Sequence, residues 1–204
     1  KQGLELHNHF HVNAQPDDAN RQEISQALLQ KISCLKTANT SLATFKIPTP
    51  SPLLNSGLTL VVDALRDPGN LGTIIRLCDW FGVTQLVCSR DTVDCYNPKV
   101  VQATMGSIAR VSIHYLDIDH YLQQSKLPIY TAMMDGQNVY NATLASDAIL
   151  IMGNEANGVS QQIKALSTHQ IAIPQFGELH ATESLNVATA TAILLSEFAR
   201  ITEK

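Results

Sequence analysis

Three short stretches of the chain carry polar residues of the kinds that bind ligands, and each stretch directly follows an apolar run. In the first, "DPGNLGTIIR", an amide and a guanidinium flank a glycine turn. Amides donate and accept hydrogen bonds, and a carboxylate can hold a guanidinium in a bidentate contact. A strand, a glycine turn and a helix are typical of a nucleotide pocket. The three groups are Asn70, Gly72 and Arg76; Gly153, Glu155 and Gly158; and Ile173, Pro174, Ser184, Leu185, Asn186 and Val187.

The common phosphate loops do not account for these stretches. A dinucleotide fingerprint needs G-x-G-x-x-G, and a Walker loop ends in Gly-Lys-Ser/Thr; neither is present. Taken singly, each stretch is typical of a turn whose polar residues cap a helix: Asn70 as an N-cap, Glu155 in a first helical turn and Ser184 as cap of the last helix. Three such groups at three strand ends favour a shared site.

The elements that must position these residues alternate between strands and helices. Apolar runs predict strands at 58–65, 83–89, 110–116, 128–134, 147–154 and 169–175. Helical spacing predicts helices at 71–82, 97–109, 117–125, 160–167 and 183–203, with Asp117 and Ser160 as caps and Gly82 as a stop. This order predicts a parallel α/β sheet with helices on both faces. Ligands of such sheets gather at the carboxyl ends of the strands.

The amino-terminal part reads differently. Its first 20 or so residues show little periodicity, although His7, His9 and His11 alternate, which would place them on one face of a strand. A metal site there is the weaker interpretation, and an edge strand or a disordered leader is favoured. Residues 21–36 have the spacing of an amphipathic helix. The proline-rich stretch 45–57 indicates a linker, so we expect an N-terminal segment at 1–56 and a main domain at 57–204.

Composition narrows the class of protein. The 204 residues are 45% hydrophobic and 16% charged, typical of a folded soluble chain, and no window approaches the ~20 apolar residues of a membrane helix. No apolar stretch follows the first basic residue, so we expect no signal peptide. None of the four cysteines forms a C-x-x-C pair, which favours free thiols in a reducing cytosol and no zinc site.

The charge pattern leaves two interpretations open. The net charge of −4 argues against a basic module that wraps nucleic acid unaided. Five cations fall in the central stretch, interleaved with acidic residues, which is typical of a solvated face and leaves room for a local basic patch. These cations are Arg66, Arg76, Arg90, Lys99 and Arg110.

Together, the three stretches resemble the three motifs of the SpoU (TrmH-type) RNA 2′-O-ribose methyltransferases of the SPOUT superfamily. The resemblance covers Leu58 to about Ile201. It implies S-adenosylmethionine (AdoMet) as methyl donor, a homodimer and a C-terminal trefoil knot. It also implies that residues 1–56 are the remnant of a small substrate-binding domain. The implied substrate is structured RNA, ribosomal or transfer, methylated in the cytoplasm.

The resemblance also implies roles for individual residues. The expected catalytic group is Arg76, Asn70, Glu155, Ser184 and Asn186, and the expected cofactor-binding group is Thr131, Ala132, Met152, Gly153, Ile173 and Leu185. Because a guanidinium is effectively never neutral in a protein, we expect Arg76 to grip a phosphate rather than act as a base. The alternatives are a non-catalytic RNA-binding module of the same fold and, from another class, a nucleotide-dependent oxidoreductase.

Overall fold

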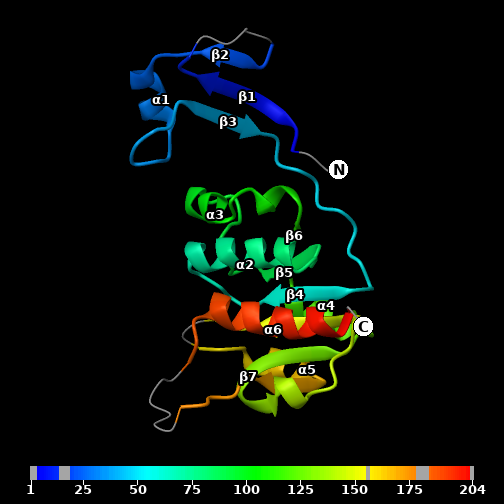
Figure 1. Cartoon of the computed structure of the whole chain (residues 1–204). Coiled ribbons are helices and arrows are strands. Elements are labelled where there is room, and N and C mark those ends of the chain that lie inside the picture. Colours follow the sequence, from blue (N-terminus) through cyan, green and yellow to red (C-terminus); the bar gives the residue numbers. More distant parts are fainter. Residues whose placement is uncertain (1–3, 14–18, 155–156, 178–183, 203–204) are drawn as a thin grey trace. The chain divides into compact units, whose positions relative to one another are not determined.

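The computed structural model describes residues 4–13, 19–154, 157–177 and 184–202 (Figure 1). The chain divides into two compact units, Lys1–Thr49 and Pro50–Lys204. They join in a segment without helix or strand, residues 46–57. In the described residues no helix is long and apolar enough to cross a membrane.

The first unit is a three-stranded sheet with one helix. Its elements are β1 (Leu6–His11), β2 (Arg21–Glu23), α1 (Gln26–Ile32) and β3 (Ser41–Phe45), and the strand order is β2-β1-β3. The predicted helix at 21–36 is therefore wrong at its start, because Arg21–Glu23 pairs in parallel with His9–His11. The helix begins only after Ser25, whose hydroxyl accepts a hydrogen bond from the backbone N–H of Leu28.

The histidine-bearing strand lies at the centre of this sheet, so its predicted place at an edge is wrong. His9 Nε2 lies 2.7 Å from the hydroxyl of Ser41, and His11 Nδ1 lies 2.6 Å from the carbonyl oxygen of Asn13. Across the described part of the chain, no three His, Cys, Asp or Glu side chains are grouped to hold a metal ion. His9 thus contacts the neighbouring strand, and His11 contacts the residues that follow its own strand.

The second unit is a six-stranded parallel sheet, as predicted, and its strand order is β6-β5-β4-β8-β7-β9. The strands are β4 (Leu58–Val62), β5 (Gln85–Ser89), β6 (Ser112–Leu116), β7 (Ile129–Asn138), β8 (Ala148–Met152) and β9 (His169–Ala172). The helices are α2 (Pro68–Trp80), α3 (Pro98–Ala103), α4 (Ile118–Gln124), α5 (Gln161–Leu166) and α6 (Val187–Thr202), with 3₁₀ turns at Ser107–Ala109 and Val139–Asn141.

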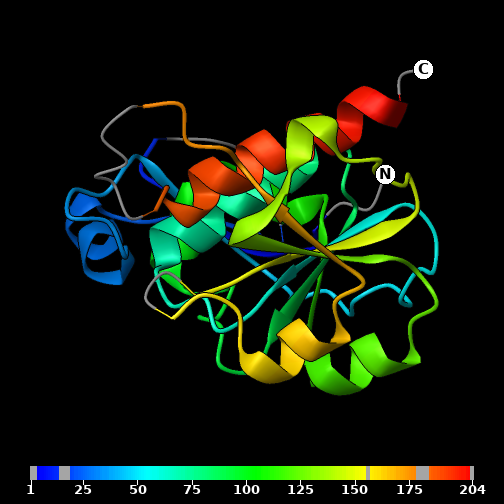
Figure 2. The same ribbon diagram turned by 90° about the horizontal axis from the view of Figure 1, so that it is seen from below.

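Alternating side chains divide the apolar core between the two faces of this sheet. Leu60 and Val62 face a cluster that includes residues of α2 and α6, whereas Val61 faces a cluster that includes residues of α4 and α5. Figure 2 shows α2 and α6 on one side of the sheet and α4 and α5 on the other. Helices on both faces explain why the strands read as continuous apolar runs.

Local signals predicted most of the helix ends correctly. Asp117 and Ser160 cap α4 and α5, and Gly82, at φ +72°, follows the last residues of α2. The helix predicted at 97–109 is shorter, since Met105 and Gly106 both take positive φ and separate α3 from a 3₁₀ turn. The left-handed backbone there ends the α-helical hydrogen-bond pattern.

Candidate functional site

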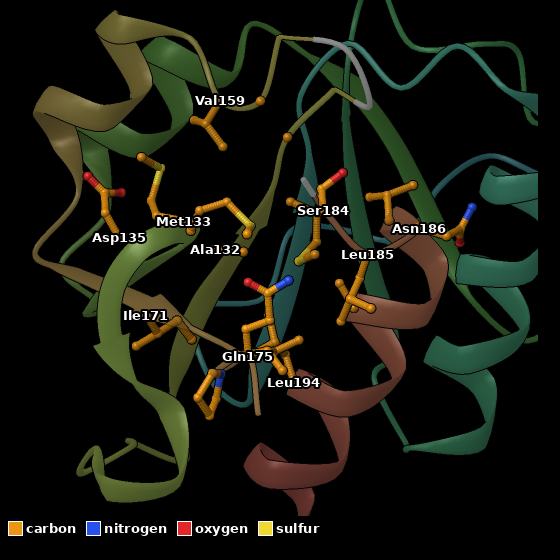
Figure 3. Close-up of a pocket in the computed structure, with 18 of the residues that line it drawn as sticks. Ala132, Met133, Asp135, Val159, Ile171, Gln175, Ser184, Leu185, Asn186 and Leu194 are labelled. Carbon is orange, nitrogen blue, oxygen red and sulfur yellow. The ribbon is translucent and has the colours of Figure 1, made fainter. Parts of the chain in front are cut away.

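A cavity of about 920 Å³ lies at the carboxyl ends of β7, β8 and β9 (Figure 3). Its size falls in the range of small-molecule sites, about 300–1,000 Å³. Figure 3 shows Ser184 and Leu185, on the segment that enters α6, across the cavity from Met133 and Asp135. The lining residues are Ala132, Met133, Met134, Asp135, Met152, Gly153, Asn154, Gly158, Val159, Lys164, Ile171, Ile173, Pro174, Gln175, Phe176, Gly177, Ser184, Leu185, Asn186, Val187, Ala190 and Leu194.

The second sequence motif forms one wall of this cavity. Asn154 and Gly158 exchange two backbone hydrogen bonds of 2.9 Å, which closes the turn between β8 and α5. A Cβ atom at Gly153 would lie 2.5 Å from the backbone nitrogen of Val159 and 2.7 Å from the carbonyl oxygen of Gly158. Only glycine lets these backbones cross so closely. The predicted catalytic residue Glu155 lies outside the described residues.

The third motif forms the facing wall and the start of α6. Ile173, Ser184 and Leu185 all line the cavity. The expected helix cap Ser184 is replaced by Asn186, whose side-chain oxygen accepts hydrogen bonds from the backbone N–H groups of Ala188, at 2.9 Å, and Thr189, at 3.2 Å. Asn186 is favoured because it lies directly before the first helical residue, where a side-chain acceptor reaches those N–H groups. The hydroxyl of Ser184 is exposed at the cavity instead.

The first motif reaches the cavity through one hydrogen bond. The side-chain nitrogen of Asn186 donates to the side-chain oxygen of Asn70 at 3.0 Å. Asn70 is not the cap of α2, because the carboxylate of Asp67 accepts the backbone N–H of Asn70 at 2.7 Å. A Cβ atom at Gly72 would lie 2.8 Å from the carbonyl oxygen of Val100, so this glycine serves the close packing of α2 on α3.

Arg76 lies apart from the lining residues. It is exposed on α2, and within the ranges that the structure describes its side chain makes no hydrogen bond or ion pair. By contrast, Arg110 donates to Asp79 on the same helix at 2.7 Å and holds the pKa of that carboxyl below its usual value. Arg110 is therefore engaged within the fold, whereas the guanidinium of Arg76 is open to a ligand.

The structure separates the two candidate cofactor residues on β7. Ala132 lines the cavity, whereas Thr131 is fully buried and its hydroxyl is hydrogen-bonded to that of Ser167. Met152, at the end of β8, also lines the cavity. Thr131 thus stabilises the contact between β7 and the end of α5, and Ala132 presents the surface that a ligand would touch.

Sequence reasoning missed the cavity-lining residues that lie in a bulge of β7. Ala132 and Gln137 both pair with Ile171, so Met133, Met134 and Asp135 leave the regular ladder between them and line the cavity. A Cβ atom at Gly136 would lie 2.7 Å from the backbone nitrogen of Ile171. An isolated glycine inside an apolar strand is a recognised sign of a bulge, and it could have revealed these residues.

The buried thiols are poor candidates for a nucleophile. Burial raises the pKa of Cys78 and Cys88, and it raises that of Cys95 to about 11. The thiolate is the reactive form, so these cysteines are inert near neutral pH. They belong to the apolar cluster under α2. The chemistry of the site therefore falls to hydroxyl, amide, carboxylate and guanidinium groups.

A parallel α/β domain with a cavity at the carboxyl edge of its sheet, walled by glycine turns and polar loops, is a cofactor- or nucleotide-binding domain. The chain belongs to the SpoU rRNA Methylase family, which it matches over residues 57–196.

Relatives of this chain are named as ribosomal RNA methyltransferases. The chain is 33% identical over 140 residues to 23S rRNA (guanosine(2553)-2′-O)-methyltransferase RlmP of Bacillus subtilis (strain 168), which covers 67% of this chain and 55% of the relative. It is 30% identical over 200 residues to 23S rRNA (guanosine-2′-O-)-methyltransferase RlmB of Blochmanniella floridana, covering 89% of this chain and 76% of that one. The chain spans a little over half the length of RlmP and of an uncharacterised Synechocystis relative.

Solved structures resemble both units. A protein from Porphyromonas gingivalis, assigned to the TrmH family of RNA methyltransferases, superposes with a TM-score of 0.85 at 37% identity, over 97% of this chain and 84% of that one. The SpoU methyltransferase AviRb from Streptomyces viridochromogenes, solved with AdoMet, has a TM-score of 0.84 at 20% identity, over 100% and 85% of the two chains. The second likeness is one of fold.

Proposed function

We propose that the chain is an AdoMet-dependent methyltransferase that modifies the 2′-hydroxyl of a ribose in structured RNA. One observation carries this proposal: loops far apart in sequence meet at one cavity, and Asn186 joins that cavity to Asn70 of the first motif. RlmP and RlmB are named as 23S rRNA enzymes, which makes ribosomal RNA the first substrate to test and transfer RNA the second. We also propose that the chain acts in the cytoplasm, as expected for an enzyme with such substrates.

The lining of the cavity suits AdoMet. Ile173 and Leu185 offer apolar walls to an adenine, and Gly153 lets a backbone approach the cofactor closely. Asp135 supplies a negative charge that complements the cofactor's ammonium group. When bound, AdoMet supplies an electrophilic methyl group on a sulfonium that leaves as a neutral thioether.

The residues of the chain would position the ribose and help its hydroxyl lose a proton. The 2′-oxygen would take the methyl group as the sulfur–methyl bond breaks, and the hydroxyl proton would pass to solvent water. The guanidinium of Arg76 would bind a phosphate beside the ribose, and its charge would favour loss of the hydroxyl proton. Asn70 and Ser184 would hold the ribose, and Glu155 would orient Arg76.

A homodimer is part of this proposal. The described lining of the cavity contains residues of the second and third motifs, whereas Arg76 lies exposed on α2. A second copy of the chain would bring Arg76 of the partner subunit to the cavity and complete the site. The trefoil knot stays a prediction from the family resemblance. We also propose that the unit at Lys1–Thr49 selects the RNA.

The proposal is tested by mapping 2′-O-methyl sites in total RNA from cells with and without the gene, which should differ at one or a few nucleotides. In vitro, Arg76→Lys should keep part of the RNA binding in a filter assay and lose most of the tritiated methyl transfer. Equal loss of both would contradict the role given to Arg76. RNA binding by a wild-type chain that binds no AdoMet would instead support a non-catalytic RNA-binding module.

A further inference from the structure

We infer that Asp63 is a positioning residue: with the left-handed Ala64, it fixes residues 153–154 and 157–160, the described part of the loop between β8 and α5 that walls the cavity. The inference rests on the proposed function. Neither residue is among those that line the cavity. Their effect on a bound cofactor must therefore pass through the loop residues Gly153, Asn154 and Val159.

Asp63 holds the loop at both of its ends. Its backbone N–H donates to the carbonyl oxygen of Met152 at 2.9 Å, where the loop leaves β8. Its carboxylate accepts the backbone N–H of Ser160 at 3.0 Å, where the loop enters α5. One residue of β4's carboxyl end thus sets the separation between the two ends of the loop.

Ala64 holds the loop at a third point. Its backbone takes φ +54°, which L-residues other than glycine seldom adopt. In this conformation its carbonyl oxygen accepts the side-chain N–H of Asn154 at 2.6 Å, and its N–H donates to the hydroxyl of Ser89 at 2.8 Å. The strained backbone of Ala64 therefore also connects the loop to the end of β5. Backbone strain of this kind is typically retained at sites whose geometry matters for function.

A carboxylate is an unusual choice for this place if stability alone is at issue. Asp63 is 9% exposed, and in the part of the chain that the structure describes it has no ion-pair partner. Burying a charge is unfavourable, and a neutral acceptor would satisfy one backbone N–H. A charge-assisted hydrogen bond is roughly twice as strong as a neutral one. The stronger bond suits a contact that must hold the loop in one position.

The test compares four variants of the full chain by calorimetric titration with AdoMet. Asp63→Ala removes the acceptor, and we expect a rise of about tenfold in the AdoMet Kd. Asp63→Asn keeps an acceptor oxygen without the charge and should restore part of the affinity, with a Kd between those of Asp63→Ala and the wild type. Ser160→Pro removes the donor instead, at a backbone φ of −61° that proline accepts, and should raise the Kd similarly. Ser160→Ala keeps the N–H and should leave the Kd unchanged.

The matched control lies at the opposite, amino-terminal ends of β4 and β8. The carboxylate of Asp147, just before β8, accepts the backbone N–H of Gly57, just before β4. Asp147→Ala also breaks a carboxylate-to-backbone bond, and it should leave the AdoMet Kd unchanged. An equal rise in Kd for Asp147→Ala would overturn the inference, because any loss of stability would then suffice.

Amide hydrogen exchange without cofactor separates this inference from the proposed function. Asp63→Ala and Ser160→Ala should differ at residues 157–160, with faster exchange only in the former. If folded Asp63→Ala shows unchanged exchange at residues 157–160, the inference that Asp63 holds the loop is overturned, even if the wild-type chain binds AdoMet. A wild-type chain that binds no AdoMet would contradict the proposed function, while the exchange result would still decide whether Asp63 holds the loop.

Discussion

Gly153→Ala is the most direct perturbation of the cavity wall. The added methyl group would lie 2.5 Å from the backbone nitrogen of Val159 and 2.7 Å from the carbonyl oxygen of Gly158. Non-bonded heavy atoms settle at about 3.5 Å or more, so the crossing backbone must retreat by about 1 Å. The atoms in the way belong to backbone and cannot rotate aside as the end of a side chain can.

The size of the effect follows from that retreat. Overpacking of a closely packed site costs about 1–3 kcal/mol. If the strain falls on the loop that holds the cofactor, AdoMet binding weakens by about fivefold to about 150-fold. If the strain instead destabilises the folded state, each kcal/mol of lost stability lowers Tm by about 2–4 °C in a chain of this size. Calorimetric titration and a thermal melt of the same sample measure the two parts.

Gly177→Ala is the matched control for this prediction. Gly177 also lines the cavity, but a Cβ atom there would meet nothing within 4 Å. The variant should bind AdoMet and melt as the wild-type chain does. The reasoning is refuted if Gly153→Ala keeps both the AdoMet Kd and Tm of the wild type, or if Gly177→Ala loses as much affinity as Gly153→Ala.

Three further predictions concern the surroundings of the site. Gly72→Ala should lower stability by about 1–3 kcal/mol in a denaturant titration, because its methyl group would meet α3 rather than a ligand. Asn186→Ala should lose about 1 kcal/mol of helix capping, whereas Asn186→Asp should keep the cap in the same titration but lose the donor to Asn70 and with it methyl transfer. Burial lowers the pKa of His114, so the unfolded chain takes up a proton at a higher pH than the folded chain does. Thermal melts should therefore show a stability that falls as the pH decreases below about 6.5. The fall should be smaller in His114→Gln.

The sequence predicted the second unit well because its signals are local and agree with one another. Continuous apolar strands, Asp117 and Ser160 as caps and Gly82 as a stop all point to the same parallel sheet. The first unit was predicted poorly. Residues 21–23 directly precede the apolar residues with helical spacing, but their pairing with β1 is a tertiary contact that spacing alone does not encode.

The candidate site shows the same division between local and tertiary information. Motif residues such as Gly153, Ser184 and Leu185 were expected at the cavity and lie there. Asp135 was missed because it enters the cavity only through a bulge that doubles the pairing of Ile171. Thr131 and Ala132 are adjacent in sequence, and only the direction of each side chain from β7 decides which one faces the cavity.

The hydrogen bond between Asn186 and Asn70 links the third motif to the first. Asn186 uses its side-chain oxygen to start α6 and its side-chain nitrogen to hold the first turn of α2. Both helices cover the same face of the sheet, and they pack against one another. A shift of the segment that carries Ser184 and Leu185 therefore moves the cavity wall and the helix that bears Arg76 together. On the proposed function, this link would let cofactor binding in one subunit set the position of the guanidinium that the same subunit places at its partner's cavity.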